Sequence, residues 1–295
     1  MKLKEPKSFE EQLNILESRG VEVKDRDACI SFLKTVNYYR FTAYLLTFRN
    51  KDGETYKRVS FETPFMIYMF DQALRTLLFS YIEDIEVYLR TQIAYYHGHK
   101  YGPDGYEKAS NYNKRHNHET FWKRVEDCIK GHEDSPAVVH HKEKYDGHFP
   151  VWVIVELFSI GQLSYFYRGL VYNDREKISR NLYGIKNRTL LSWFRCLTDL
   201  RNRCAHYSRL YYWVFPAIPS FSEFGIDMEL KEDNRKLFYQ ILMLSKMYPN
   251  SDVWNFQFLD QLEELINTYK HYINLNCIGF PENWKELLKK QADHQ

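Results

Sequence analysis

Apolar residues recur every three or four positions along most of the chain, a spacing that predicts helices rather than strands. Ser8 and Glu11 form a capping box, in which each side chain can bond to the other residue's backbone N–H, and Gly20 suits the end of the helix that follows. A second short helix is expected over 27–36. Residues 50–53, Asn-Lys-Asp-Gly, are typical of a turn or a hairpin tip.

The longest helical pattern begins at Thr63 and Pro64, residue types that are favoured at the N-cap and at the first position of a helix. No further Gly or Pro occurs before Gly98. We therefore expect a helix of about 34 residues, roughly 50 Å long at 1.5 Å per residue. A helix of that length implies that several others pack along it.

Shorter helices joined by polar loops are expected in the rest of the chain. Residues 99–118 and 131–150 are predicted as loops, with a helix over 119–130 between them. Residues 151–157 could form a strand by propensity, but the apolar pattern continues past Gly161, which favours a buried helix. The remaining helices are expected over 174–183, 187–205, 230–247, 256–273 and 282–291.

The fold class that follows is all-α, with one very long helix and minor or no strand. Only 12 Gly and 9 Pro occur in 295 residues, which argues against a sandwich or barrel of many short strands. We expect a single helical domain over 1–295, with an N-terminal helical part over about 1–62 and a long-helix core over about 63–295.

Composition excludes several classes of protein. A net charge of +2 means that any affinity for nucleic acid must come from a local patch. Five scattered cysteines without a C-x-x-C pair suggest reduced thiols and a cytoplasmic location. No apolar run is long enough to span a bilayer, and the first residues have no signal-peptide core, so no membrane partner is expected. No metal-ligand spacing is present, and we expect neither a metal nor a cofactor.

The most informative short segment is Arg201-Asn-Arg-Cys-Ala-His206, near the end of the helix expected over 187–205. Arginine holds its charge at any pH and histidine transfers protons near neutrality, so the pair suits phosphodiester chemistry. On a helical wheel Arg201 falls inside the apolar stripe, whereas Asn202 and His206 fall on the opposite face. The apolar stripe consists of Leu190, Trp193, Phe194, Leu197, Leu200 and Cys204.

About 140° separate Arg201 from His206, so the two side chains converge poorly within one chain. Two copies related by a twofold axis would bring them together, and a charge in an apolar stripe supports a site at a helix or subunit interface. Asn202 stands four residues before His206 and could orient the imidazole. The plainer alternative is an amphipathic helix whose Arg201 pairs with a carboxylate and whose His206 is a surface group.

Other residues are candidates for contact with RNA. Arg90 and His97 form a second Arg/His pair seven residues apart, although Arg90 more simply pairs with Glu86. Arg40 follows Asn-Tyr-Tyr and either stacks among tyrosines or forms part of an RNA-stacking surface. Lys114 and Arg115 begin the strongest basic cluster, which is either a solvated face or a groove for an RNA backbone. The set is completed by Arg203, inside the Arg201–His206 segment, and by Tyr207 and Arg209, just after it.

Six segments carry a resemblance to a known family: Lys7–Gln12, Leu16–Gly20, Asn37–Arg40, Val151–Tyr165, Leu191–Trp193 and Leu200–Leu210. In them the chain resembles the Abi-like family, the abortive-infection AbiD/AbiF group of phage-resistance proteins. The last segment looks like the R-x(4–6)-H motif of the HEPN superfamily of helical RNases and RNA-binding proteins.

The resemblance implies a helical HEPN core that dimerises through the motif helix, and either metal-independent RNA cleavage or RNA binding without cleavage. It implies that Arg201 and His206 are the catalytic pair, with Asn202 in support. Abi-like proteins act as toxins in infected cells, and some are restrained by a small noncoding RNA. Some HEPN toxins carry a modifiable tyrosine two places after the histidine, where this chain has Ser208, so that form of control is not expected here.

Three functional classes follow. The first is an RNA-cleaving toxin in phage defence, with target RNA and a noncoding antitoxin RNA as partners. The second is a noncatalytic RNA-binding module or scaffold that uses the same residues. The third is a helical dimer with no role in RNA metabolism.

Overall fold

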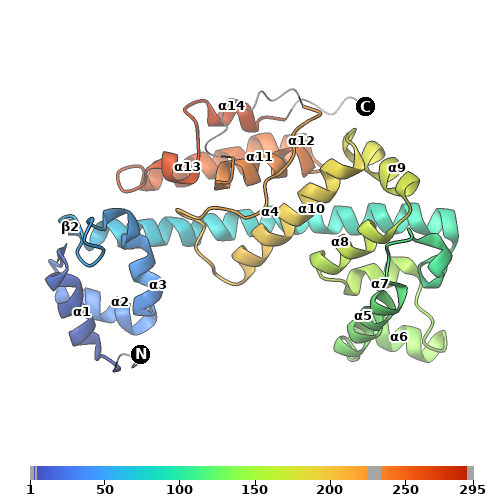
Figure 1. The fold of residues 1–295 in the computed structure, drawn as a ribbon, viewed down its shortest axis with the longest axis horizontal. Helices are drawn as coiled ribbons and strands as arrows, with labels where there is room; N and C mark the ends of the chain where they lie inside the picture. The colour runs from blue at the N-terminus through green and yellow to red at the C-terminus, as the bar shows by residue number, and fades with distance from the viewer. Residues whose placement is uncertain (1–2, 4, 225–233, 291–295) are drawn as a thin grey trace.

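One long helix forms the spine of the molecule (Figure 1). The computed structural model describes residues 3, 5–224 and 234–290. Helix α4, Glu62–Tyr101, has 40 residues and is about 60 Å long at 1.5 Å per residue. Helices from both halves of the chain pack along it, which confirms the all-α prediction. The strands of the described residues are β1, Val21–Glu22, and β2, Val59–Ser60, which pair in parallel.

Helix α4 extends beyond both predicted ends. It begins at Glu62 with Phe61 as the N-cap residue, so Thr63 is not the N-cap. It continues through Gly98, which lies against Val151 and Trp152. A Cβ at Gly98 would lie 3.4 Å from side-chain carbons of Val151 and Trp152. The helix ends where Gly102 takes a φ of +84°, a conformation that favours glycine.

The N-terminal part packs around a small core of its own at one end of α4 (Figure 1). Helix α1, Phe9–Ser18, begins with the predicted capping box, and α2 covers Arg26–Thr35. Helix α3, Tyr38–Thr42, runs into a 3₁₀ segment, Ala43–Phe48. The predicted turn is also present, since Asn50 N–H donates to the Thr55 carbonyl at 2.9 Å.

At the other end of α4, four helices form a second group (Figure 1). They are α5, His118–Gly131; α6, Pro136–Lys144; α7, Val151–Leu157; and α8, Ile160–Gly169. The prediction of a loop over 131–150 was wrong for α6, where Ser135 is the N-cap and Pro136 takes the first position. Residues 151–157 are helical as predicted, but a second capping box at Ser159 begins α8 as a separate helix.

The last third of the described chain covers the middle of α4 (Figure 1). Helix α9 is Tyr172–Tyr183, and α10, Asn187–Ala205, has the predicted bounds. The prediction over 230–247 corresponds to α11, Leu237–Met247, and residues 225–233 lie outside the described residues. The chain continues with α12, Ser251–Val253, then a π-helical turn, Trp254–Phe258, and then α13, Leu259–Tyr269. Helix α14 covers Trp284–Leu288. No helix among the described residues is both long enough and apolar enough to cross a membrane.

Candidate site at the end of helix α10

The core stripe of α10 is buried as predicted, and it turns the end of the helix toward α4. Leu190, Trp193, Phe194, Leu197 and Leu200 are fully buried, and Cys204 is nearly so. Burial of this stripe sets the rotation of α10 about its own axis. The rotation in turn decides which way the polar residues of the last two turns point.

Arg201 points toward α4, where a carboxylate pairs with it. Its Nε lies 3.1 Å from Glu86 Oε1, and its guanidinium carbon lies 5.8 Å from the centre of the Phe79 ring. Glu86 also pairs with Arg90 at 3.2 Å through its second oxygen. The Arg201 side chain keeps 30% of its surface exposed, so the guanidinium is both paired and reachable. The predicted pairs of Arg201 with a carboxylate and of Arg90 with Glu86 are both confirmed.

His206 is exposed at the point where α10 ends. Ser208 N–H donates to the Arg203 carbonyl at 2.8 Å, and Tyr207 N–H donates to the Cys204 carbonyl at 3.2 Å. This pair of bonds is a Schellman motif, which places one residue in the left-handed region. That residue is Tyr207, with a φ of +56°. These hydrogen bonds fix the backbone on both sides of His206, and the His206 imidazole faces solvent.

Asn202 is exposed near His206 but does not orient it. Its side-chain oxygen accepts from Arg201 Nη1 at 3.4 Å. Among the described residues, no hydrogen bond joins the Asn202 amide to the His206 imidazole, or the Arg201 guanidinium to that imidazole. One copy of the chain therefore shows Arg201 and His206 on different sides of the helix end, as the wheel predicts.

A buried carboxylate on α4 ties down the chain that follows the motif. Asp71 is fully buried, and it accepts from Leu210 N–H at 3.1 Å and from Tyr211 N–H at 2.8 Å. It also accepts from Tyr44 Oη at 2.6 Å and forms an ion pair with Arg75. Asp71 was not among the residues predicted from the sequence. Its signal is an Asp and an Arg four residues apart on the apolar face of a helix.

The N-terminal part contacts the same segment. Arg40 donates to the Tyr207 carbonyl, one residue after His206, and Arg209 donates to the Ala43 carbonyl. A hollow of about 910 Å³ lies beside these contacts and includes Phe79 in its lining. Arg40 is therefore placed next to the candidate site by a bond that sequence spacing does not reveal.

The other RNA-contact candidates lie in different environments. His97 is fully buried, and burial lowers its pKa to about 4, so it offers no surface to RNA in this fold. Arg203 stacks on the Trp213 ring at 3.5 Å, and burial lowers the pKa of both Arg203 and Arg209. Tyr207 is 69% exposed.

The exposed basic residues Lys114 and Arg115 lie far along the chain from the motif. They line a groove with Arg168 and Arg175 at the end of α8 and the start of α9. Leu191, in the first half of α10, lines it too.

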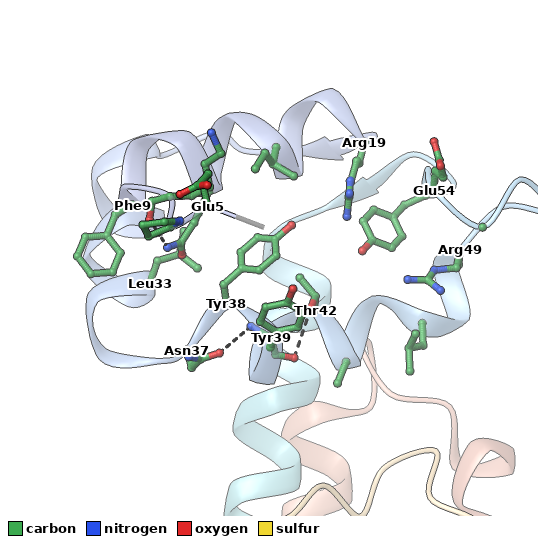
Figure 2. A pocket seen from close by; sticks show the side chains of 18 residues that line it. Glu5, Phe9, Arg19, Leu33, Asn37, Tyr38, Tyr39, Thr42, Arg49 and Glu54 are labelled. Atoms are coloured by element: carbon green, nitrogen blue, oxygen red, sulfur yellow. Dashed lines mark hydrogen bonds between the residues drawn. The ribbon is translucent and has the colours of Figure 1, made fainter. Parts of the chain in front are cut away.

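A further hollow of about 1180 Å³ lies in the N-terminal part. Figure 2 shows Tyr38 and Tyr39 projecting from α3 into this region, with Arg19 and Arg49 on one side of it. Tyr39 is 73% exposed and precedes Arg40 directly. The hollow therefore borders the helix that contacts Tyr207, but its lining includes Glu5 and Glu54 as well as cations.

Comparison with known proteins supports one family. A family model described as Abi-like protein matches residues 31–212, which include Arg40, all of α4 and the Arg201–His206 segment. No curated protein and no solved structure matches the chain. The matched residues make up more than half of the chain, and it therefore belongs to the Abi-like family of abortive-infection proteins, which act in phage defence.

Proposed function

We propose that this chain is an RNA-targeting defence protein that cleaves RNA without a metal, as a homodimer, through Arg201 and His206. The observation that carries the proposal is the cap of α10. An exposed imidazole is held on a fixed backbone, with Arg201 partly exposed five residues earlier and Arg40 bonded to the carbonyl of Tyr207, the next residue along the chain.

The chemistry follows from these side chains. His206 accepts the proton of an RNA 2′-OH, and the 2′ oxygen attacks the adjacent phosphorus. The bond from phosphorus to the 5′ oxygen breaks, and the leaving oxygen takes up a proton. Arg201 stabilises the charge on the phosphate oxygens. The products are a 2′,3′-cyclic phosphate and a 5′-hydroxyl, and DNA is inert because it lacks the 2′-OH.

A dimer is part of the proposal because one copy supplies half of the chemistry. Arg201 faces α4 and Glu86, whereas His206 lies at the cap. A twofold axis near the motif helix brings the Arg201 of one copy to the His206 of the other. Each composite site then holds one Arg201 and one His206, and water supplies the proton that the leaving oxygen takes up.

The proposed regulation is restraint by a small noncoding RNA. A site built from Arg and His binds phosphate whether or not it cleaves, so an RNA that resists cleavage can occupy it. We propose that such an RNA holds the protein inactive until infection.

The second candidate is an RNA-binding module without cleavage. The observation that favours it is the ion pair of Arg201 with Glu86, because a phosphate must share the guanidinium with a carboxylate that also holds Arg90. In that case Arg201 and His206 hold RNA, and no bond breaks.

Single-turnover cleavage of labelled RNA separates the two candidates. Arg201→Ala and His206→Ala are each expected to slow cleavage by roughly 100-fold or more, the usual contribution of a charge-stabilising group and of a general base. His140→Ala, which removes another exposed histidine, is the control and should cleave like wild type.

Equal rates in all four proteins would contradict the cleavage proposal. Intact RNA in every reaction, with binding that weakens in the Arg201 and His206 variants, would support the noncatalytic candidate. A substrate with a single 2′-deoxy nucleotide at the cleaved position should resist cleavage and still bind.

A further inference from the structure

A basic groove lies at the end of α8, away from the Arg201–His206 segment. It has a volume of about 630 Å³, and Lys114, Arg115, Arg168 and Arg175 contribute four cations to its lining. None of the described residues that line it is acidic. In a chain with a net charge of only +2, four cations without a carboxylate make a strong local field.

The groove has a rigid floor. Asn113 Nδ2 donates to the carbonyls of Arg168 at 2.9 Å and Gly169 at 2.7 Å, which fastens the loop to the end of α8. The His116 ring stacks on Tyr112 at 4.1 Å, with 9° between the ring planes. A Cβ at Gly169 would lie 2.4 Å from His116 Nδ1, so this close packing requires glycine.

Two polar groups in the groove lack a partner. His116 Nε2 and Arg175 Nε are buried, and neither has a hydrogen-bond partner within the part of the chain that the structure describes. Arg175 Nε is a donor, and a buried donor without a partner costs free energy that a bound ligand can remove. Together with the exposed Lys114, Arg115 and Arg168, these groups favour an anion that carries several oxygens.

Aromatic rings accompany the cations. Two guanidinium carbons lie near the Tyr165 ring, that of Arg124 at 4.5 Å and that of Arg168 at 5.2 Å from its centre. Tyr172 also lines the groove and is 59% exposed. An exposed ring beside phosphate-binding cations suits an unstacked base, and RNA supplies a base with every phosphate.

Helix α10 connects the groove with His206. Leu191 lines the groove, and His206 caps the same helix 15 residues later, about 22 Å along the axis. Arg188, Arg195 and Asn202 are exposed and seven residues apart, so they share the face of α10 on which His206 lies. This exposed stripe continues from the groove to the end of the helix.

We propose that the groove of Lys114, Arg115, Arg168 and Arg175 binds the sugar-phosphate backbone of single-stranded RNA, and that the exposed stripe of α10 leads the strand to His206. The proposal rests on the proposed function, because it takes His206 as the end point of the strand. The groove would bind RNA without taking part in the cleavage reaction itself.

The test is binding of a fluorescent single-stranded RNA to full-length protein carrying His206→Ala, over a series of salt concentrations. Adding Arg115→Gln and Arg168→Gln should weaken binding roughly tenfold. It should also reduce the slope of log affinity against log salt by about 1.4, because each phosphate that a cation neutralises adds about 0.7 to that slope. The matched control adds Lys130→Gln and Lys144→Gln, two exposed cations outside the groove, and should bind like the parent.

Unchanged affinity and slope in the groove variant would overturn the proposal and leave the proposed function intact. Competition by poly-glutamate as strong as that by unlabelled RNA would assign the groove to an acidic peptide and would also overturn it. Absence of RNA binding by the parent would remove the proposed function and the groove proposal together. If Arg168→Gln lowers the melting temperature, Lys114→Gln with Arg115→Gln, both in the exposed loop, is measured instead against the same predictions.

Discussion

Asp71 is the residue on which three segments of the chain depend. Burial raises the pKa of its carboxyl group, and Arg75 with the Tyr44, Leu210 and Tyr211 donors opposes that effect. The carboxylate satisfies two backbone N–H groups directly after the motif, so its charge and its shape both matter. A residue with these bonds is a structural anchor for the site rather than a member of it.

We expect Asp71→Asn to lower the free energy of unfolding by roughly 3–5 kcal/mol, because it leaves the buried Arg75 without its counter-charge. Urea unfolding at neutral pH measures this. Asp127→Asn, at an exposed position on α5, is the control and should change stability by less than about 0.5 kcal/mol. A loss at Asp71 no larger than that of the control would contradict the anchoring role.

His97 makes stability depend on pH. Its pKa in the folded protein is lowered to about 4 by burial, with Lys100 lowering it further and Asp174 opposing. Because the folded value lies below the unfolded value of about 6.5, the unfolded chain takes up a proton first as the pH falls. The stability from a neutral His97 is therefore present above about pH 6.5 and is lost as the pH falls toward 4, by up to roughly 3 kcal/mol.

His97→Leu should remove this part of the pH dependence, whereas the same substitution at the exposed His140 should not. Urea unfolding midpoints at several pH values between 7.5 and 4.5 give the comparison. A His97→Leu variant that loses stability with falling pH as steeply as wild type and the His140 variant would contradict this role of His97.

At the scale of elements, the first and last residues of α10 could be predicted from the sequence, but the conformation of its C-terminal cap could not. The six apolar residues of its core stripe define one buried face, and burial of that face is enough to specify the helix. Tyr207 gives no signal for the cap, because a left-handed residue at this position is usually Gly or Asn. The Arg40 bond to the Tyr207 carbonyl and the two cap bonds hold that conformation.

Tyr207→Gly should therefore raise the free energy of unfolding by about 1 kcal/mol, because it removes the steric cost of a left-handed side chain. Thermal unfolding followed by circular dichroism is a suitable measurement. Tyr207→Val should destabilise the protein, since a β-branched residue suits a positive φ even less. Equal melting temperatures for the Gly and Val variants would show that the cap conformation carries no strain.

At the scale of the whole molecule, α4 joins the N-terminal part to the group of α5–α8, with the motif segment between them (Figure 1). Within the described chain, three hydrogen bonds connect the N-terminal part with residues 207–212, directly after the Arg201–His206 segment. Arg40 donates to the Tyr207 carbonyl, Arg209 donates to the Ala43 carbonyl, and the Thr47 hydroxyl donates to Tyr212 Oη at 2.7 Å. The site is therefore assembled from residues more than 160 positions apart in sequence.

The proposed dimer makes a prediction at this scale. Arg201→Ala and His206→Ala should each be inactive alone, but mixed subunits that exchange should recover activity, because one composite site then has both side chains. Random exchange gives half heterodimers with one of two sites intact, so about a quarter of wild-type cleavage is expected. A mixture with no activity, while sedimentation shows that subunits have exchanged, would contradict a site shared between copies.

The sequence by itself determined the helical class, the long central helix, the buried stripe of α10 and the opposed directions of Arg201 and His206. Those features depend on the 3.6-residue period of the helix and on the burial of apolar side chains away from water. Both can be evaluated from neighbouring residues in the sequence. Only the tertiary structure decided that Glu86 pairs with Arg201, that Asp71 holds the chain after the motif, and that Arg40 bonds to the Tyr207 carbonyl. It also decided that α4 runs through Gly98 as far as Tyr101, because packing along a 40-residue helix offsets the low helix propensity of one glycine. These outcomes depend on which distant surfaces meet, and helical spacing carries no information about that.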